Sequence, residues 1–250
     1  MNPTRKTPIV AVVPAHPRRP RTRWLVPAGL ILLSLVPVFF GMVRLTELAG
    51  GAAVTPGNER FFDSPIPVLI HVPAVTVYCL LGAFQFVPLL RRGRRGWHRA
   101  AGRILVPAGL LAALSGLWMS VFYDLPDGDG EILLVLRLAF GSAMVVSIVL
   151  GLLAIRRRDF ARHGAWMARA YAIGVGAGTV VLLTIPWVLL TGPTGELSRA
   201  VLMGAAWVVN LAVAEYFIYR RFQASPQAAG TSGANTLTGP RRGAPQGPRE

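Results

Sequence analysis

The chain has 250 residues and a formal net charge of +15, with 53% apolar and 15% charged residues. A soluble domain carries about 25% charged residues, so this composition excludes an ordinary soluble globular protein. The single cysteine, Cys79, excludes an internal disulfide framework and a cysteine-based zinc site.

Residues 1–23 are basic and rich in proline, and we interpret them as a disordered tail. Six long apolar stretches follow, each long enough to cross a hydrocarbon core of about 30 Å. The predicted fold is therefore an all-α polytopic membrane bundle over residues 24–221. Its six transmembrane helices cover about residues 24–43, 66–90, 104–123, 132–155, 165–190 and 198–219. Residues 222–250 are poor in apolar side chains and predict a second disordered tail.

The segments between the apolar stretches alternate in charge. The N-terminal tail, the second loop and the fourth loop are rich in arginine, and Arg220 and Arg221 follow the sixth stretch. The third loop, from Asp124 to Glu131, has four acids and no base, and we interpret it as a solvated outer turn. Because basic residues are retained in the cytoplasm, both termini are predicted to be cytoplasmic in a multipass protein of the cell inner (plasma) membrane.

The basic clusters flank apolar stretches instead of forming one face. Topology therefore explains the net charge better than nucleic-acid binding, and the expected partner is the lipid bilayer, with no nucleic acid. The P-loop, HExxH and GxSxG motifs are all missing, so the sequence offers no hydrolase or kinase machinery. These observations leave open whether the protein is an enzyme.

Polar side chains inside a membrane span are costly, and each requires a partner or a role. The set comprises His71, Gln85, Arg137, Arg169, Asn210 and Glu215, with His98 and His163 at the cytoplasmic starts of the third and fifth spans. Arg169 and Glu215 are expected at the same inner depth with opposite charge. A mutual ion pair would relieve both charges, whereas snorkelling of Arg169 to the interface is the alternative.

His98 and His163 are expected at the same membrane level on different helices. Two imidazoles that converge from two helices can hold a haem iron axially, with Arg99 and Arg169 available to the haem propionates. They can also hold a divalent metal. The alternative is a pair of interfacial histidines that bind headgroups or loop carbonyls.

His71 stands alone in the apolar second span. Its functional interpretations are a haem ligand, a quinone hydrogen-bond partner or a proton relay, and the structural alternative is a neutral histidine bonded to a neighbouring helix. In the fifth span, Gly174 and Gly178 form a GxxxG spacing, which permits close helix packing but also occurs in helices that are merely rich in glycine.

Three elements between about residues 71 and 169 form a recognisable pattern. These are Gly82-Ala-Phe-Gln85-Phe86, the HRxxGR element His98-Arg-Ala-Ala-Gly102-Arg103, and the HxxWMxR element His163-Gly-Ala-Trp166-Met167-Ala-Arg169. With His71, they resemble the bacterial multipass membrane proteins catalogued as domain of unknown function 2306.

The resemblance implies a fold and no activity. The layout of that family is similar to transmembrane b-type cytochromes and ferric reductases, which hold haems between histidine pairs on alternate helices. Carried over by position, His98 and His163 suit an inner haem. At the outer level His71 has no histidine partner, because Arg137 lies on the fourth span instead.

Two hypotheses follow. The first is a multipass membrane protein that binds a b-type haem or a quinone and acts in electron transfer, with a quinone or another redox protein as its partner. The second is a non-enzymatic membrane scaffold or small transporter without a cofactor, in which the histidines and arginines only anchor helices.

Overall fold

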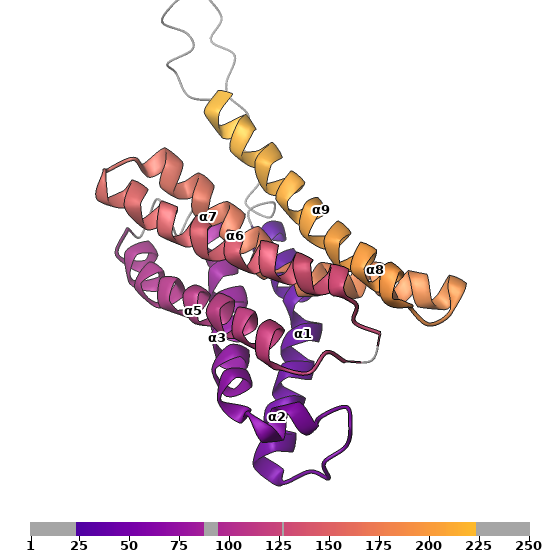
Figure 1. The fold of residues 1–250 in the computed structure, drawn as a ribbon. Helices are drawn as coiled ribbons and strands as arrows, with labels where there is room; N and C mark the ends of the chain where they lie inside the picture. The colour runs from indigo at the N-terminus through magenta and orange to yellow at the C-terminus, as the bar shows by residue number, and fades with distance from the viewer. Residues whose placement is uncertain (1–23, 88–94, 127, 224–250) are drawn as a thin grey trace, which may run out of the picture. The chain divides into compact units, whose positions relative to one another are not determined.

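The computed structural model describes residues 24–87, 95–126 and 128–223, and the regular structure in these ranges is helical (Figure 1). The elements are α1 (Leu25–Gly50), α2 (Glu59–Asp63), α3 (Pro65–Ala83), η2 (Phe84–Phe86), α5 (Arg95–Phe122), α6 (Glu131–Arg156), α7 (Phe160–Gly174), α8 (Gly176–Thr191) and α9 (Glu196–Gln223). Residues 1–23 and 224–250, on which the two predicted tails fall, lie outside the described ranges. The chain forms two compact units, Met1–Ser115 and Gly116–Glu250, and their boundary lies inside α5.

Within the described residues, five helices are long and apolar enough to cross a membrane, and a sixth span results if α7 and α8 count as one. Large apolar side chains on these helices are exposed, such as Phe39 and Phe40 of α1 at 62% and 64%. Apolar surface of this extent is stable against lipid and not against water. The predicted all-α polytopic membrane fold is therefore confirmed.

In the first unit, α3 is the central helix and packs along α1. Its buried side chains include Val72, Tyr78 and Cys79. Gly41 of α1 lies against Val72, and a Cβ at position 41 would approach the Val72 Cγ1 to 2.9 Å. Small residues thus allow the backbones of α1 and α3 to come close.

In the second unit, α6 and α7 form a tightly packed helical hairpin (Figure 1). The turn covers residues 157–159. Arg158 has a left-handed backbone with φ of 60°. Asp159 then caps α7, because its side chain accepts a hydrogen bond from the Arg162 backbone N–H at 2.9 Å. This short turn holds the beginning of α7 beside the end of α6.

The fifth apolar stretch differs from the single helix that the sequence predicts. It breaks at Val175, and its two halves, α7 and α8, are bent by 42°. Gly174 and Gly178 therefore lie on different helices, and the GxxxG interpretation, which requires one continuous helix, is wrong. The glycine-rich sequence lowers helix stability at this point, and Trp207 of α9 approaches Gly176 at the start of α8.

Candidate functional site

His71 on α3 is hydrogen-bonded to α5. Its Nδ1 lies 2.9 Å from the carbonyl oxygen of Ala112 and 3.0 Å from the Ser115 Oγ. The Ser115 hydroxyl has one proton, which it donates to a carbonyl of its own helix, with Leu111 at 2.5 Å and Ala112 at 3.2 Å. Both neighbours of Nδ1 are therefore acceptors. We assign the proton of a neutral His71 to Nδ1, which leaves the lone pair on Nε2.

His163 in the first turn of α7 has a similar arrangement. Its Nδ1 lies 2.9 Å from the carbonyl oxygen of Gly151 on α6. A carbonyl can only accept, so Nδ1 is the donor and Nε2 of the neutral ring again carries the lone pair. Trp166 and Met167 pack against Gly151, where a Cβ would overlap the Met167 side chain. The glycine thus lets α7 approach α6 closely enough for this hydrogen bond.

These hydrogen bonds restrict what the two histidines can do chemically. A histidine that donates from Nδ1 to a backbone carbonyl has a fixed ring orientation and a fixed tautomer, as metal-ligating histidines usually do. The carbonyls come from neighbouring helices, 41 residues from His71 and 12 from His163. No pattern in the sequence indicates these partners, because they depend on helix packing.

His98 lies in the first turn of α5, where it is half-buried, and Arg99 beside it is exposed. His98 belongs to the first unit and His163 to the second. A shared haem or metal at these two histidines, with Arg99 at a propionate, stays a prediction.

Gln85 in η2 is a polar residue that the sequence placed near the end of the second span. Its Nε2 is buried and makes no hydrogen bond to any residue within 24–87, 95–126 or 128–223. A buried donor without a protein acceptor is uncommon in native structures.

The structure brings Arg169 of α7 and Glu215 of α9 together. The Arg169 Nε lies 2.5 Å from Oε1 and its Nη2 lies 2.9 Å from Oε2 of Glu215. The guanidinium also lies over the Trp166 ring, 4.6 Å from its centroid. A role of Arg169 toward a haem propionate would therefore compete with Glu215 for the same guanidinium.

The third loop corrects an expectation. Asp129 is not in a solvated turn, because its carboxylate has no exposed surface. It lies 2.7 Å from Arg137 of α6 and 2.8 Å from Arg199 of α9. Gly128, with φ of 81°, permits the turn that precedes it. The sequence did contain a signal for this cluster, since Arg137 was an intramembrane cation close to four acids.

Asn210 of α9 connects both halves of the broken span. Its Nδ2 donates to the carbonyl oxygen of Ala172 on α7 at 3.1 Å, and its Oδ1 accepts from the Thr179 hydroxyl on α8 at 2.9 Å. Both ends of the amide are thereby used. Polar side chains that satisfy backbone groups at a break make such breaks tolerable inside a membrane.

The described residues contain no group of three or more His, Cys, Asp or Glu side chains that could hold a metal ion. A metal site built only from such protein ligands thus has no support in 24–87, 95–126 and 128–223. A haem differs, because the porphyrin supplies the equatorial nitrogens and the protein supplies only axial ligands.

Comparison with known proteins gives one finding. The family described as "Predicted membrane protein (DUF2306)" matches residues 68–218, from α3 into α9. The matched range contains His71, both histidine elements and Glu215. No curated protein and no solved structure matches the chain. Because the match covers more than half of the chain, this protein belongs to that family of membrane proteins of unknown function.

Proposed function

We propose that this protein is an electron-transfer protein of the inner membrane that binds a b-type haem at the cytoplasmic ends of its helices. The observation that carries the proposal is the 2.9 Å hydrogen bond from the His163 Nδ1 to the Gly151 carbonyl. It orients the ring and leaves Nε2 of the neutral ring with a lone pair, which a haem iron requires of an axial histidine.

Several residues fit such a cofactor by their chemistry. In this proposal His163 and His98 would hold the haem iron, and Arg99 would bind a propionate. A bound haem would supply reversible one-electron transfer. The chain itself contributes the fixed tautomer of His163 and the close packing of Trp166 and Met167 against α6.

A quinone is the natural partner or alternative ligand in this proposal, and two groups of the first unit favour it. The buried Gln85 amide can donate a hydrogen bond to a quinone carbonyl. The Nε2 of His71 can accept a hydrogen bond from a hydroquinone hydroxyl, because Nδ1 already donates to α5.

The second candidate is a membrane scaffold or small transporter without a cofactor. It is favoured by the number of polar groups that already join helices to one another. Arg169 pairs with Glu215, Asp129 pairs with two arginines, and Asn210 bridges the broken span. Broken spans with polar groups beside them are also a feature of transporters.

The reduced-minus-oxidised absorption spectrum of the detergent-purified protein from haem-replete cells tests the haem. We expect a Soret difference band that disappears in His163→Gln, since glutamine can still donate to the Gly151 carbonyl but offers no ligand nitrogen. His98→Ala should also lose the band, whereas His71→Ala should keep it. A colourless wild-type protein would overturn the haem proposal and favour the second candidate.

A further inference from the structure

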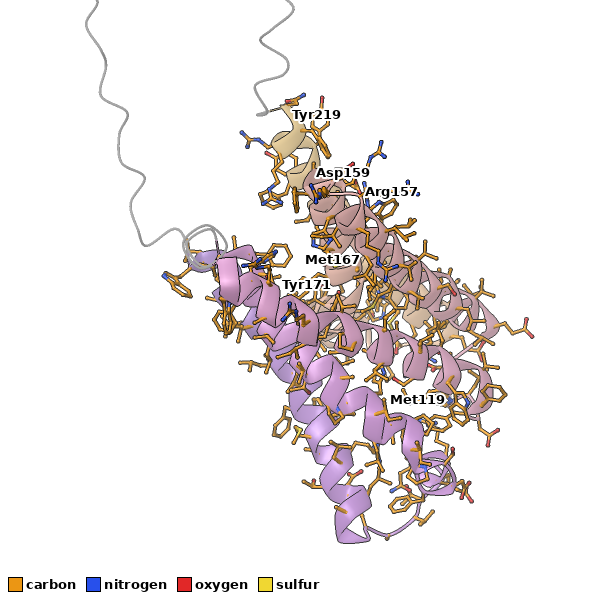
Figure 2. All side chains as sticks on the ribbon, turned by 90° about the vertical axis from the view of Figure 1, so that its left-hand side faces the viewer. Met119, Arg157, Asp159, Met167, Tyr171 and Tyr219 are labelled. Atoms are coloured by element: carbon orange, nitrogen blue, oxygen red, sulfur yellow. The ribbon has the colours of Figure 1, made fainter. Side chains whose placement is uncertain are left out.

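One end of the second unit is strongly basic. The end of α6, the beginning of α7 and the last turn of α9 each contribute exposed arginines to it. Within residues 116–126 and 128–223, these arginines are Arg156, Arg157, Arg158, Arg162, Arg220 and Arg221, which we call the arginine cluster. Figure 2 shows Arg157, Asp159 and Tyr219 at this same end.

The packing of α9 on α7 brings the cluster together. The two helices run antiparallel, with Glu215 paired to Arg169. Two turns further along, an Arg221 Nη1 lies 3.9 Å from the position that a Cβ on Gly164 would take. The last turn of α9 therefore lies beside the first turn of α7, next to the α6–α7 turn.

The described acidic side chains near the cluster leave its three consecutive arginines, Arg156–Arg158, without an acidic partner. Asp159 caps α7 and lies 3.4 Å from the Arg162 Nε. Glu215 is occupied by Arg169. The consecutive residues Arg156–Arg158 make no ion pair with any described residue of the second unit. Their positive charge is available to an anion from outside the protein.

The backbone conformation of Arg158 distinguishes it from the other arginines of the cluster. It is the one non-glycine residue with positive φ among residues 24–87, 95–126 and 128–223. It ends α6 in a turn in which the backbone N–H groups of Arg158 and Asp159 donate to carbonyls of Ile155 and Ala154. Glycine is the usual residue at this place, because a Cβ is disfavoured there.

A requirement for positive charge in this loop does not explain the position of Arg158. Any neighbouring residue with an ordinary backbone could carry that charge without strain. Strained residues tend to occur where the side chain has a function. The guanidinium of Arg158 is therefore the best candidate for direct contact with a ligand.

We propose that the arginine cluster binds the phosphodiester headgroup of an anionic phospholipid. Guanidinium groups bind phosphate oxygens in a bidentate manner. The cluster lies at the ends of membrane-spanning helices, and Phe160 and Tyr219 beside it are exposed at 68% and 63%. Exposed aromatic rings next to basic residues are typical of the headgroup level. This site does not depend on haem or quinone binding.

Titration of the purified full chain in neutral detergent micelles tests the site, with fluorescent phosphatidylglycerol compared with phosphatidylcholine. We expect the wild type to prefer phosphatidylglycerol. Arg158→Gly should reduce this preference about fivefold, because one arginine near an anionic surface contributes roughly that factor. Its melting temperature should be equal or higher, because glycine fits φ of 60°. Arg158→Lys should keep most of the preference.

The matched control is Arg60→Gln, which removes one positive charge from α2 in the first unit and should leave the preference unchanged. An unchanged preference in Arg158→Gly, or an equal loss in Arg60→Gln, would overturn the site. Competition by inorganic phosphate as strong as by phosphatidylglycerol would assign a free-anion site instead. Stronger competition by polyglutamate would assign an acidic protein partner, and both results would reject the lipid assignment.

Discussion

Several polar residues of the described helices and loops pair with side chains from distant parts of the sequence. Arg169 and Glu215 were expected at one depth with opposite charge, and the structure joins them in a two-point ion pair. Asp129 was expected in solvent, and the structure buries it between two guanidiniums. The first prediction was right because the depth of a residue in a span follows from counting residues. The second was wrong because the path of a loop depends on how the helices that it connects pack.

Asp129→Asn tests the importance of that buried carboxylate. Asparagine has nearly the same side-chain shape as aspartate, but it leaves Arg137 and Arg199 close together without a negative charge between them. We expect a loss of about 2–3 kcal/mol in the free energy of unfolding, below the full cost of breaking a buried pair because Arg199 is partly solvated. Denaturant titration in detergent micelles measures it.

The control is Asp124→Asn, which removes an exposed acid from the same loop. This substitution should change the free energy of unfolding by no more than about 0.5 kcal/mol. Equal effects of the two substitutions would mean that the buried ion pairs contribute nothing specific to stability.

At the scale of elements, the broken span is the feature that the apolar pattern could not reveal. Residues 165–190 contain no proline before Pro186 and read as one continuous apolar stretch. The break at Val175 becomes understandable only with α9 in place. Asn210 then accepts and donates hydrogen bonds across the break, and Trp207 lies close to Gly176.

Gly176→Ala tests this packing. The new Cβ would lie 2.5 Å from the Trp207 Nε1, and Trp207 is itself stacked on Phe140 with ring centroids 4.7 Å apart. The ring therefore has little room to move, and we expect a destabilisation of about 1–3 kcal/mol. Thermal unfolding followed by tryptophan fluorescence provides the measurement.

Gly29→Ala on α1 is the matched control, because no atom outside its own turn lies within 4 Å of the added Cβ. Alanine should be neutral or slightly stabilising there, since it favours the helix. If Gly176→Ala unfolds at the same temperature as Gly29→Ala, the contact with Trp207 is not tight.

At the scale of the whole molecule, we propose that both termini are cytoplasmic. The arginine-rich turn after α6 and the end of α9 would then face the cytoplasm, and the loop that contains Asp129 would face outward. A fusion of green fluorescent protein to the C-terminus should fluoresce. Alkaline phosphatase should be active when inserted after Asp124 and inactive at the C-terminus. Phosphatase activity at the C-terminus would overturn the orientation.

The sequence by itself determined the membrane fold, because long apolar stretches can be satisfied only as helices in lipid. It also identified the family through His71 and the two histidine elements, which lie inside the matched residues. Only the tertiary structure decided which carbonyls hold the imidazoles of His71 and His163, and which arginines enclose Asp129. Those partners lie on other helices or beyond a loop, and no local pattern encodes a contact that arises from the packing of separate helices.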